Sequence, residues 1–366
     1  MRVLFISGSF PPIKCGIGDY LLMLARALVS SGSVTVGVLT GRDAVAPAEA
    51  ADIELLPVME NWSLGSLRHL LRTVRGWRPD IVHIQYPTRG YGRGKMPLLL
   101  PLLLSRQGLP VVQTWHEPLG FMRGLRYLPC AMMRDAFVTV EPDFRPFVPG
   151  FVWRLLRRKR RFRHIPVGAM IPAVTMSPAE RAALKGEYAA DDRNLVVYFG
   201  FAIPSKGVEA LFDIVDPEVD RLVLICELDP EDEYHRRIAG RLAEERWQGK
   251  ATVTGYLPGE EVARLLAAAD AALFPFAAGM TGRNTSVYAA QAQGTFVLTT
   301  HREKHGYIER ENIYYARPGD LADQRAALRR YCGGRGGAPS TADWPTIAAA
   351  HLDLYRDCLT ENYRGD

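Results

Sequence analysis

The chain has 366 residues, enough for two domains, and its 48% hydrophobic and 23% charged residues are ordinary for a globular enzyme. No run of eighteen apolar residues occurs, so we expect no membrane-spanning helix, and the first residues lack the layout of a secretory signal. The five cysteines are scattered without a CxxC pair, which argues against a zinc site or a disulfide framework and favours a cytoplasmic location.

The net charge of +5 originates in one segment, residues 154–163, which holds seven basic residues and no acidic one. The remaining 38 basic and 40 acidic residues nearly cancel. A single basic segment is a local signal for adhesion to an anionic surface, whereas nucleic-acid-binding proteins are basic more generally. We therefore expect no nucleic-acid partner.

Short apolar runs alternate with helical patterns along the first half, which predicts an α/β fold with parallel sheets covered on both faces. Strands are predicted at 2–6, 34–39, 53–58, 80–85, 110–114, 137–140 and 163–166. Helices are predicted near 18–29, 64–77, 96–105 and 150–161.

A proline-containing seam at 167–174 precedes Ser177-Pro178-Ala179-Glu180, whose pattern predicts a capping box at a helix start. The strand–helix rhythm then resumes, with strands at 195–199, 222–225, 251–254, 272–274 and 296–299 and helices near 208–214, 233–245, 260–268 and 285–293. A last helical pattern covers about 343–361. We predict one Rossmann-like domain at 1–169, a second at 170–342, and a C-terminal helix within 343–366 that packs back toward the first domain.

In the first half, polar and glycine residues follow three predicted strands, where open α/β sheets bind ligands. Gly16, Ile17 and Gly18 open a helix, whose N-terminal N–H groups favour phosphate. Position 21 is leucine, so the dinucleotide fingerprint is incomplete and a dehydrogenase is disfavoured. The other strand-end candidates are Gln85, Tyr86, His116 and Glu117, whereas His83 lies inside its strand and is expected to be a core histidine.

The second half repeats this arrangement with cations. Gly200 leads to Lys206 and Gly207 at a helix start, where a lysine can neutralise a diphosphate. Arg283, Asn284, Thr285 and Ser286 open a later helix, and the planar guanidinium fits phosphate oxygens. The competing interpretation is a solvated lysine and a well-capped surface helix. We predict a phosphate-bearing substrate gripped between the two domains.

These motifs, in their order, resemble the fourth family of retaining glycosyltransferases, which has the GT-B fold of two facing Rossmann-like domains with an interdomain cleft. The resemblance spans nearly the whole chain. It rests on Gly16–Gly18, Thr114-Trp115-His116, Gly200 to Lys206-Gly207, Gly255-Tyr256-Leu257 and the helix before Gly294. It implies a hexosyl-type transferase (EC 2.4 class) that binds its acceptor with the first domain and a nucleoside-diphosphate sugar with the second.

The resemblance also implies residue roles. The backbone at Gly16–Gly18 would approach the diphosphate and sugar, His116 would contact the transferred sugar, and Lys206 would hold the diphosphate. Gly200, Gly207 and the backbone near Tyr256 would complete the donor site, with Arg283–Ser286 facing the donor phosphates. Gln85, Tyr86 and Glu117 are assigned to acceptor or sugar contacts.

Two positions depart from the family pattern. Phe201 stands where an arginine usually follows the glycine, and the paired glutamates are replaced by Thr281 and Ala289. The chain is thus predicted to be a divergent member. The alternatives are a GT-B epimerase or inverting transferase, and a non-catalytic nucleotide-sugar-binding partner of another transferase. No DxD-type motif lies near these loops, so we expect no metal or other cofactor.

The basic segment adds a membrane hypothesis. Apolar residues recur at helical spacing between positions 144 and 156. They are Phe144, Phe147, Val148, Phe151, Val152, Leu155 and Leu156. Trp153, Arg157, Arg158, Lys159, Arg160 and Arg161 are predicted to face an anionic membrane surface. The competing interpretation is a core-packed helix with a solvated charged face. We expect a peripheral membrane enzyme of polysaccharide, glycan or glycolipid synthesis. Its acceptor is predicted to be membrane-proximal or lipid-linked.

Overall fold

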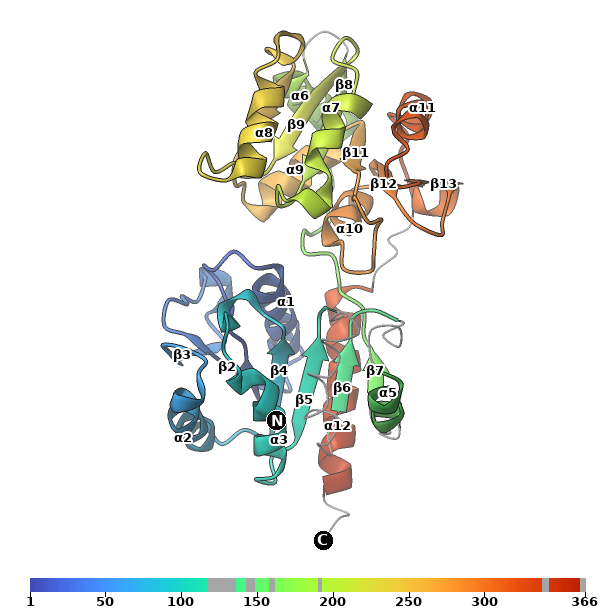
Figure 1. Ribbon diagram of the computed structural model, residues 1–366. Helices are drawn as coiled ribbons and strands as arrows, with labels where there is room; N and C mark the ends of the chain where they lie inside the picture. Colours follow the sequence, from blue (N-terminus) through green and yellow to red (C-terminus); the bar gives the residue numbers. More distant parts are fainter. Residues whose placement is uncertain (118–135, 143–148, 158–161, 190–192, 338–341, 363–366) are drawn as a thin grey trace. The chain divides into compact units, whose positions relative to one another are not determined.

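The computed structural model describes residues 1–117, 136–142, 149–157, 162–189, 193–337 and 342–362. The chain divides into two compact units (Figure 1). Unit 1 comprises residues 1–168 together with 342–366, and unit 2 comprises residues 169–341. The C-terminal segment is therefore grouped with the N-terminal half of the chain.

Unit 1 is built on a parallel sheet with the strand order β3-β2-β1-β4-β5-β6-β7. Its strands are β1 (Arg2–Ile6), β2 (Thr35–Gly41), β3 (Glu54–Met59), β4 (Ile81–Tyr86), β5 (Val111–Trp115), β6 (Ala136–Thr139) and β7 (Phe162–His164). Its described α-helices are α1 (Gly16–Ser30), α2 (Leu67–Trp77), α3 (Met96–Ser105), α5 (Gly150–Arg157) and α12 (Trp344–Asn362), with 3-10 turns at Ala48–Ala50, Leu64–Ser66 and Arg89–Tyr91.

Unit 2 has a second sheet in the order β10-β9-β8-β11-β12-β14-β13, in which β13 alone among the described strands runs antiparallel. Its strands are β8 (Asn194–Phe199), β9 (Asp220–Ile225), β10 (Ala251–Val253), β11 (Ala271–Phe274), β12 (Phe296–Thr300), β13 (Gly306–Ile308) and β14 (Ile313–Ala316). Its α-helices are α6 (Pro178–Tyr188), α7 (Leu211–Ile214), α8 (Glu233–Leu242), α9 (Gly259–Ala268), α10 (Thr285–Ala292) and α11 (Leu321–Tyr331), with 3-10 turns at Pro204–Lys206, Val208–Ala210, Glu245–Trp247 and Glu309–Glu311.

The parallel part of each sheet reverses its strand order once, between β1 and β4 in unit 1 and between β8 and β11 in unit 2. The central strands are buried on both faces; every residue of β4, β5, β11 and β12 is buried. At such a reversal the helices on either side of it cover opposite faces, so the loops at the carboxyl ends diverge and leave room for a ligand. The fold thus marks one candidate ligand position in each unit.

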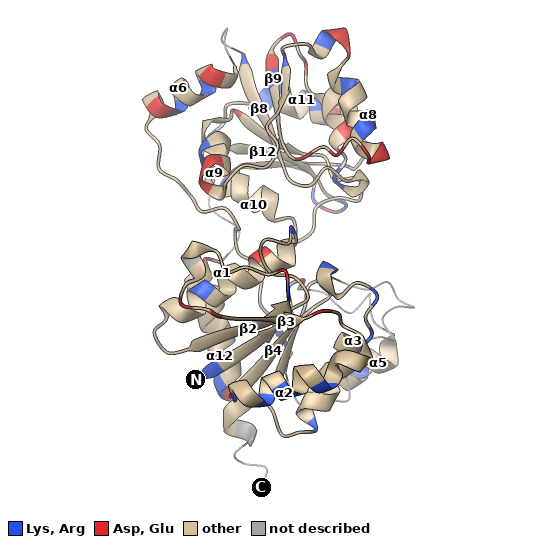
Figure 2. Ribbon diagram, turned by 90° about the vertical axis from the view of Figure 1, so that its left-hand side faces the viewer, with Lys and Arg blue, Asp and Glu red and all other residues tan. Residues whose placement is uncertain are grey.

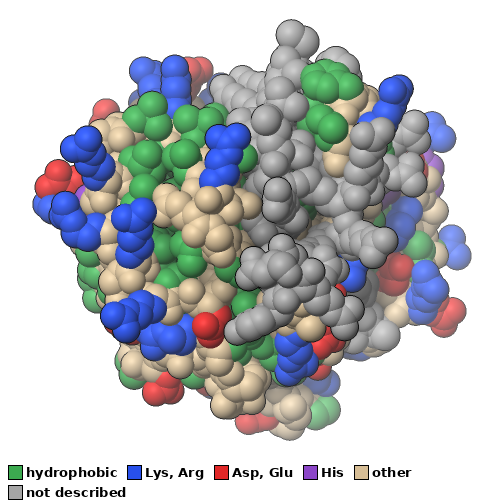
Figure 3. All heavy atoms as spheres, turned by 90° about the horizontal axis from the view of Figure 1, so that it is seen from below, with side chains coloured by type: hydrophobic (Ala, Val, Ile, Leu, Met, Phe, Trp, Pro, Cys, Tyr) green, Lys and Arg blue, Asp and Glu red, His purple; other side chains and the backbone are tan. Residues whose placement is uncertain are grey.

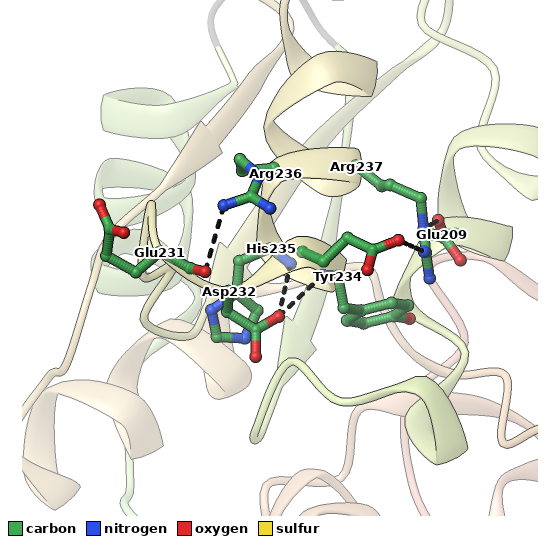
Figure 4. A network of polar contacts seen from close by, with 8 residues as sticks. Glu209, Glu231, Asp232, Tyr234, His235, Arg236 and Arg237 are labelled. Atoms are coloured by element: carbon green, nitrogen blue, oxygen red, sulfur yellow. Dashed lines mark hydrogen bonds and ion pairs between the residues drawn. The ribbon is translucent and has the colours of Figure 1, made fainter.

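Local sequence signals set several helix starts. Ser177 and Glu180 form the predicted capping box of α6 through two reciprocal bonds. At α8, Asp232 accepts hydrogen bonds from the backbone N–H groups of Tyr234 and His235 (Figure 4). The carboxylates of Glu180 and Asp232 each lie at the N-terminus of their helix, which is the positive end of the helix dipole. Figure 2 shows that acidic and basic residues concentrate on helices such as α6 and α8, as solvated helix faces require.

Most predicted strands agree with the structure within two residues. Among the strands and α-helices that the structure describes, three were not predicted. These are β13, β14 and α11, which follow one another between Gly306 and Tyr331. The two strands are short, and β14 is preceded by a run of charged residues, so neither produces a clear period-two pattern. Within the described ranges, no helix combines the length and apolarity needed to cross a bilayer.

Candidate functional site

In unit 1, the loop after β1 is held in a defined shape before α1 begins. Ser7 Oγ donates to the carbonyl of Ser9 and accepts the Ser9 backbone N–H. Gly16 is exposed at the start of α1, which has no side-chain cap, and Ile17 is partly buried. Gly18 is buried, where a Cβ would touch the backbone of Phe10 at 3.4 Å. The helix start therefore offers open backbone at the position predicted for the diphosphate and sugar.

A contact that sequence reasoning missed locks this loop to the one after β4. A Cβ at Gly90 would lie 1.6 Å from the carbonyl oxygen of Gly8, so the two backbones meet at a distance that only glycine permits. The Gly90 N–H also donates to Ser9 Oγ. The two loops that flank the strand-order reversal are thereby joined.

His116 directly follows β5 and is almost fully buried. Its Nε2 lies 2.7 Å from Gln85 Oε1, its backbone N–H donates to the Tyr86 carbonyl, and its ring meets Tyr20 edge to face. Gln85 and Tyr86 were predicted to contact acceptor or sugar, but both side chains are buried. Gln85 hydrogen-bonds to His116, and Tyr86 packs into the core of the opposite face of the sheet; their contact with acceptor or sugar stays a prediction. Glu117 is exposed.

In unit 2, Lys206 ends the 3-10 turn Pro204–Lys206 after β8, and Gly207 follows with φ of +67°. A Cβ at Gly207 would lie 2.1 Å from the carbonyl oxygen of Pro275, which follows β11. The Ala277 N–H also donates to the Ser205 carbonyl. The loops after β8 and β11, on either side of the strand-order reversal, are therefore packed backbone against backbone.

Lys206 is a partly buried cation without an acidic partner among the described residues. Its Nζ lies 4.8 Å from the centre of the Phe276 ring. Burial, followed by the nearby charge of Arg283, lowers the pKa of Lys206 to about 8. Two neighbouring cations repel each other, and an anion that binds between them relieves this repulsion. The pair therefore favours anion binding. Phe276, which desolvates the lysine, is a contact that the sequence did not suggest.

The segment before α10 brings Arg283 to this position. Asn284 Oδ1 accepts from the backbone N–H and Oγ1 of Thr281, so it shapes the loop and does not cap the helix. Arg283, Asn284, Thr285 and Ser286 are all partly buried. Of the positions where paired glutamates would be expected, Thr281 is exposed and Ala289 is fully buried. The helix start thus combines an uncapped dipole end with a cation.

Two aromatic side chains, Phe201 and Tyr256, are exposed on loops of unit 2 that follow β8 and β10. Phe201 follows Gly200, whose φ is +144°, and is 53% exposed. Tyr256 follows β10 and is 71% exposed, with Gly255 before it at φ +75°. Because β10, β9 and β8 are neighbours in a parallel sheet, both loops lie at its carboxyl edge. They are available to a planar or apolar part of a ligand.

Helix α5 has an outward apolar side. Phe151 is 51% exposed and Leu155, one turn later, is also exposed, with Arg154 beside them. Trp153, predicted to face a membrane, is partly buried and packs edge to face on Phe162, so it supports the helix from inside. Arg157 ends the helix, and Arg158, Lys159, Arg160 and Arg161 lie outside the described residues. Figure 3 shows hydrophobic and basic side chains intermingled on one face of the molecule.

Two doubly wound sheets in one chain, each with glycine-shaped loops at its strand-order reversal, define the GT-B class of fold. Comparison with known families agrees. The family model of the glycosyl transferase 4-like domain matches residues 15–200, and that of the group 1 glycosyl transferases matches residues 193–332. The first match covers more than half of the chain, which therefore belongs to the glycosyl transferase 4-like family. It is a glycosyltransferase, an enzyme of class EC 2.4.

Solved structures resemble the chain along its full length. Sucrose-phosphate synthase from Thermosynechococcus elongatus is 17% identical with a TM-score of 0.75, covering 99% of this chain and 100% of that one. The catalytic domain of starch synthase IV from Arabidopsis thaliana is 13% identical with a TM-score of 0.68, covering 98% and 99%. Anabaena HepE in complex with UDP and glucose is 14% identical with a TM-score of 0.65, covering both chains fully. No curated protein matches the chain.

Proposed function

We propose that this glycosyltransferase moves a hexosyl unit from a nucleoside-diphosphate sugar to a hydroxyl acceptor, with retention of anomeric configuration. The observation that carries the proposal is the pair of cations Lys206 and Arg283 at the strand-order reversal of unit 2, where the charge of Arg283 contributes to lowering the pKa of Lys206. The starch synthase structure contains ADP and the HepE structure contains UDP and glucose, which supports a nucleoside diphosphate as the anion.

The chemical task is to stabilise the charge that develops on the leaving nucleoside diphosphate. Lys206, Arg283 and the uncapped start of α10 would supply it from fixed positions. These groups would stabilise the charge of the leaving diphosphate, as a metal ion does in other transferases. We therefore expect glycosyl transfer to continue in the presence of EDTA. Loss of transfer on chelation, with recovery on adding Mg²⁺, would refute this.

Retention would follow a front-face route in which the leaving phosphate accepts the proton of the acceptor hydroxyl. The predicted donor loops offer no clear carboxylate nucleophile, which disfavours double displacement. His116, buried and fixed by Gln85, would contact the transferred sugar from unit 1. Trapping a covalent glycosyl-enzyme would contradict the route, and NMR of the product would establish its configuration.

The donor class can be tested by thermal shift with UDP, GDP, ADP, CMP and their sugars. A ligand that binds the native state raises its melting temperature. Lys206→Ala and Arg283→Ala should each weaken binding by about tenfold to a hundredfold, because each removes a charge-assisted contact. Arg236→Ala, an exposed arginine on α8, is the matched control. Equal stabilisation of all variants would remove the proposed diphosphate site.

One observation keeps a second function open, a non-catalytic donor-binding partner of another transferase. Thr281 and Ala289 place no carboxylate where the family resemblance leads one to expect two. A donor that stabilises the wild type but is neither hydrolysed nor transferred over long incubation would favour this alternative. Slow donor hydrolysis that is lost in Lys206→Ala would exclude it.

We also propose that the enzyme acts at the cytoplasmic face of a membrane, on a glycan, glycolipid or lipid-linked acceptor. The support is the exposed pair Phe151 and Leu155 beside the basic run 157–161. Co-sedimentation with anionic liposomes should be lost on neutralising 157–161 and weakened by Phe151→Ser. Leu64→Ser, at a 52% exposed leucine of the same unit, is the control. Equal sedimentation of every variant would contradict membrane binding.

A further inference from the structure

The buried side of the unit 1 sheet that carries His116 is unusually polar. Alternation along the strands places His83 and Gln85 of β4 on the same side, and likewise Thr114 and His116 at the end of β5. All four are buried. The opposite side of these strands is mostly apolar, and its buried Gln113 accepts a hydrogen bond from the Trp115 indole N–H. Buried polar groups need partners, so the bonds among them decide how this side is held.

The partners form two rungs between neighbouring strands. In the lower rung, His83 Nε2 lies 2.7 Å from Thr114 Oγ1. In the upper rung, two residues further along each strand, Gln85 Oε1 lies 2.7 Å from His116 Nε2. The upper rung ends at the carboxyl edge of the sheet. The lower rung lies two residues earlier on each strand, so the backbone of β4 and β5 connects the two rungs.

The lower rung is fastened to the last helix of the chain. The Tyr355 hydroxyl of α12 lies 2.6 Å from His83 Nδ1, so both ring nitrogens of His83 are engaged. Burial, then the proximity of His351 and His116, holds the pKa of His83 well below its usual range, and the ring is neutral. A neutral imidazole donates one bond and accepts the other, so the hydroxyls of Tyr355 and Thr114 together determine its tautomer.

The neighbouring tyrosine of α1 does not provide the same connection. The Tyr20 ring packs against His116, but its hydroxyl has no hydrogen-bond partner among the described residues. Tyr355 therefore supplies the hydroxyl that joins a covering helix to the lower rung.

We infer that Tyr355 and His83 are positioning residues for His116: the C-terminal helix, through His83 and Thr114, sets the orientation of the strand-end histidine. This rests on the proposed function, in which His116 contacts the transferred sugar. Neither Tyr355 nor His83 touches substrate in this scheme. Tyr355→Phe removes only the hydroxyl, leaves His83 Nδ1 unpaired, and allows the ring to change tautomer or turn.

The direct test is NMR of the full chain with labelled histidine side chains, of which there are eight. The His116 ring signals are assigned with His116→Gln. We expect Tyr355→Phe and Thr114→Val to move or broaden them, and Thr114→Ser, which keeps the hydroxyl, to restore the wild-type position. Unchanged His116 signals in both Tyr355→Phe and Thr114→Val would overturn the inference, whatever happens to activity.

A kinetic measurement separates positioning from plain destabilisation. In Tyr355→Phe we expect kcat to fall about tenfold with the donor KM within about twofold, because a misplaced contact costs rate more than binding. Val74→Ala, on the buried side of α2, destabilises the same unit and should leave kcat and the His116 signals unchanged. Equal losses of kcat in both variants would refute positioning. If the variants shift the His116 signals but the wild-type protein shows no glycosyl transfer, the positioning inference stands and the proposed function is refuted.

Discussion

Replacing Gly207 by alanine tests whether the packed loops after β8 and β11 create the anion site. The new Cβ would lie 2.1 Å from Pro275 O, whereas real contacts of this kind are essentially never below 3.0 Å. The two loops would have to separate by about 1 Å, and overpacking of that order costs about 1–3 kcal/mol. Lys206 lies next to Gly207, so its position relative to Arg283 changes with the loop.

Gly249→Ala is the matched control for the backbone strain alone. Gly249 has φ of +65°, close to the +67° of Gly207, but a Cβ there would meet nothing within 4 Å. Each substitution adds left-handed strain of about 1–2 kcal/mol. For a unit of this size, about 1 kcal/mol lowers the melting temperature by about 2–4 °C.

The assay measures both melting temperature and the Kd of the nucleoside diphosphate that stabilises the wild type. Gly249→Ala should melt a few degrees lower and bind normally. Gly207→Ala should melt lower still and bind at least about tenfold more weakly, as expected for the loss of one charge-assisted contact. If Gly207→Ala binds within twofold of Gly249→Ala, the loop contact does not position Lys206 and the reasoning is wrong.

Three further outcomes are expected. Diphosphate affinity should weaken as pH rises through about 8, because Lys206 loses its charge there, and Lys206→Arg should flatten this dependence; a flat wild-type profile would count against the site. The buried His351 has its pKa lowered to about 4, so stability present above about pH 6.5 should be lost as pH falls toward 4, at about 1.4 kcal/mol per unit. Hydrogen exchange of α12 should accelerate over that window and do so less in His351→Leu. Finally, Ser177→Ala should cost about 1 kcal/mol through the lost cap of α6 and leave diphosphate binding unchanged; a weakened Kd would place α6 near the donor.

Much of the local structure could be predicted because short-range chemistry determines it. The apolar run at β1 and the capping box at Ser177 depend on neighbouring residues alone, and both occur as predicted. His83 was expected to be a satisfied core histidine, since it lies within an apolar strand, and both its ring nitrogens are bonded. The order of the glycine, histidine and lysine motifs was also sufficient to indicate the family to which the chain belongs.

What the sequence could not provide is which of these local pieces meet. Alternation assigns Gln85 and Tyr86 to opposite sides of a strand, but only strand order and helix packing decide that both sides are buried. Trp153 belongs to an amphipathic pattern whose outward side the sequence alone could not assign. In the structure its ring packs edge to face on Phe162 of β7 and is partly buried.

The same limit applies to the anion site. Lys206 and Arg283 are 77 positions apart, and each alone suits a solvated surface equally well. The structure brings their loops together because β8 and β11 are adjacent across the strand-order reversal and the loops that follow them pack backbone against backbone at Gly207 and Pro275, which is the basis of the proposed anion site. Sequence patterns determine which residues can form a strand, a helix start or a phosphate contact. Long-range packing alone determines which of them share a site, because the energies that select it belong to contacts between distant segments.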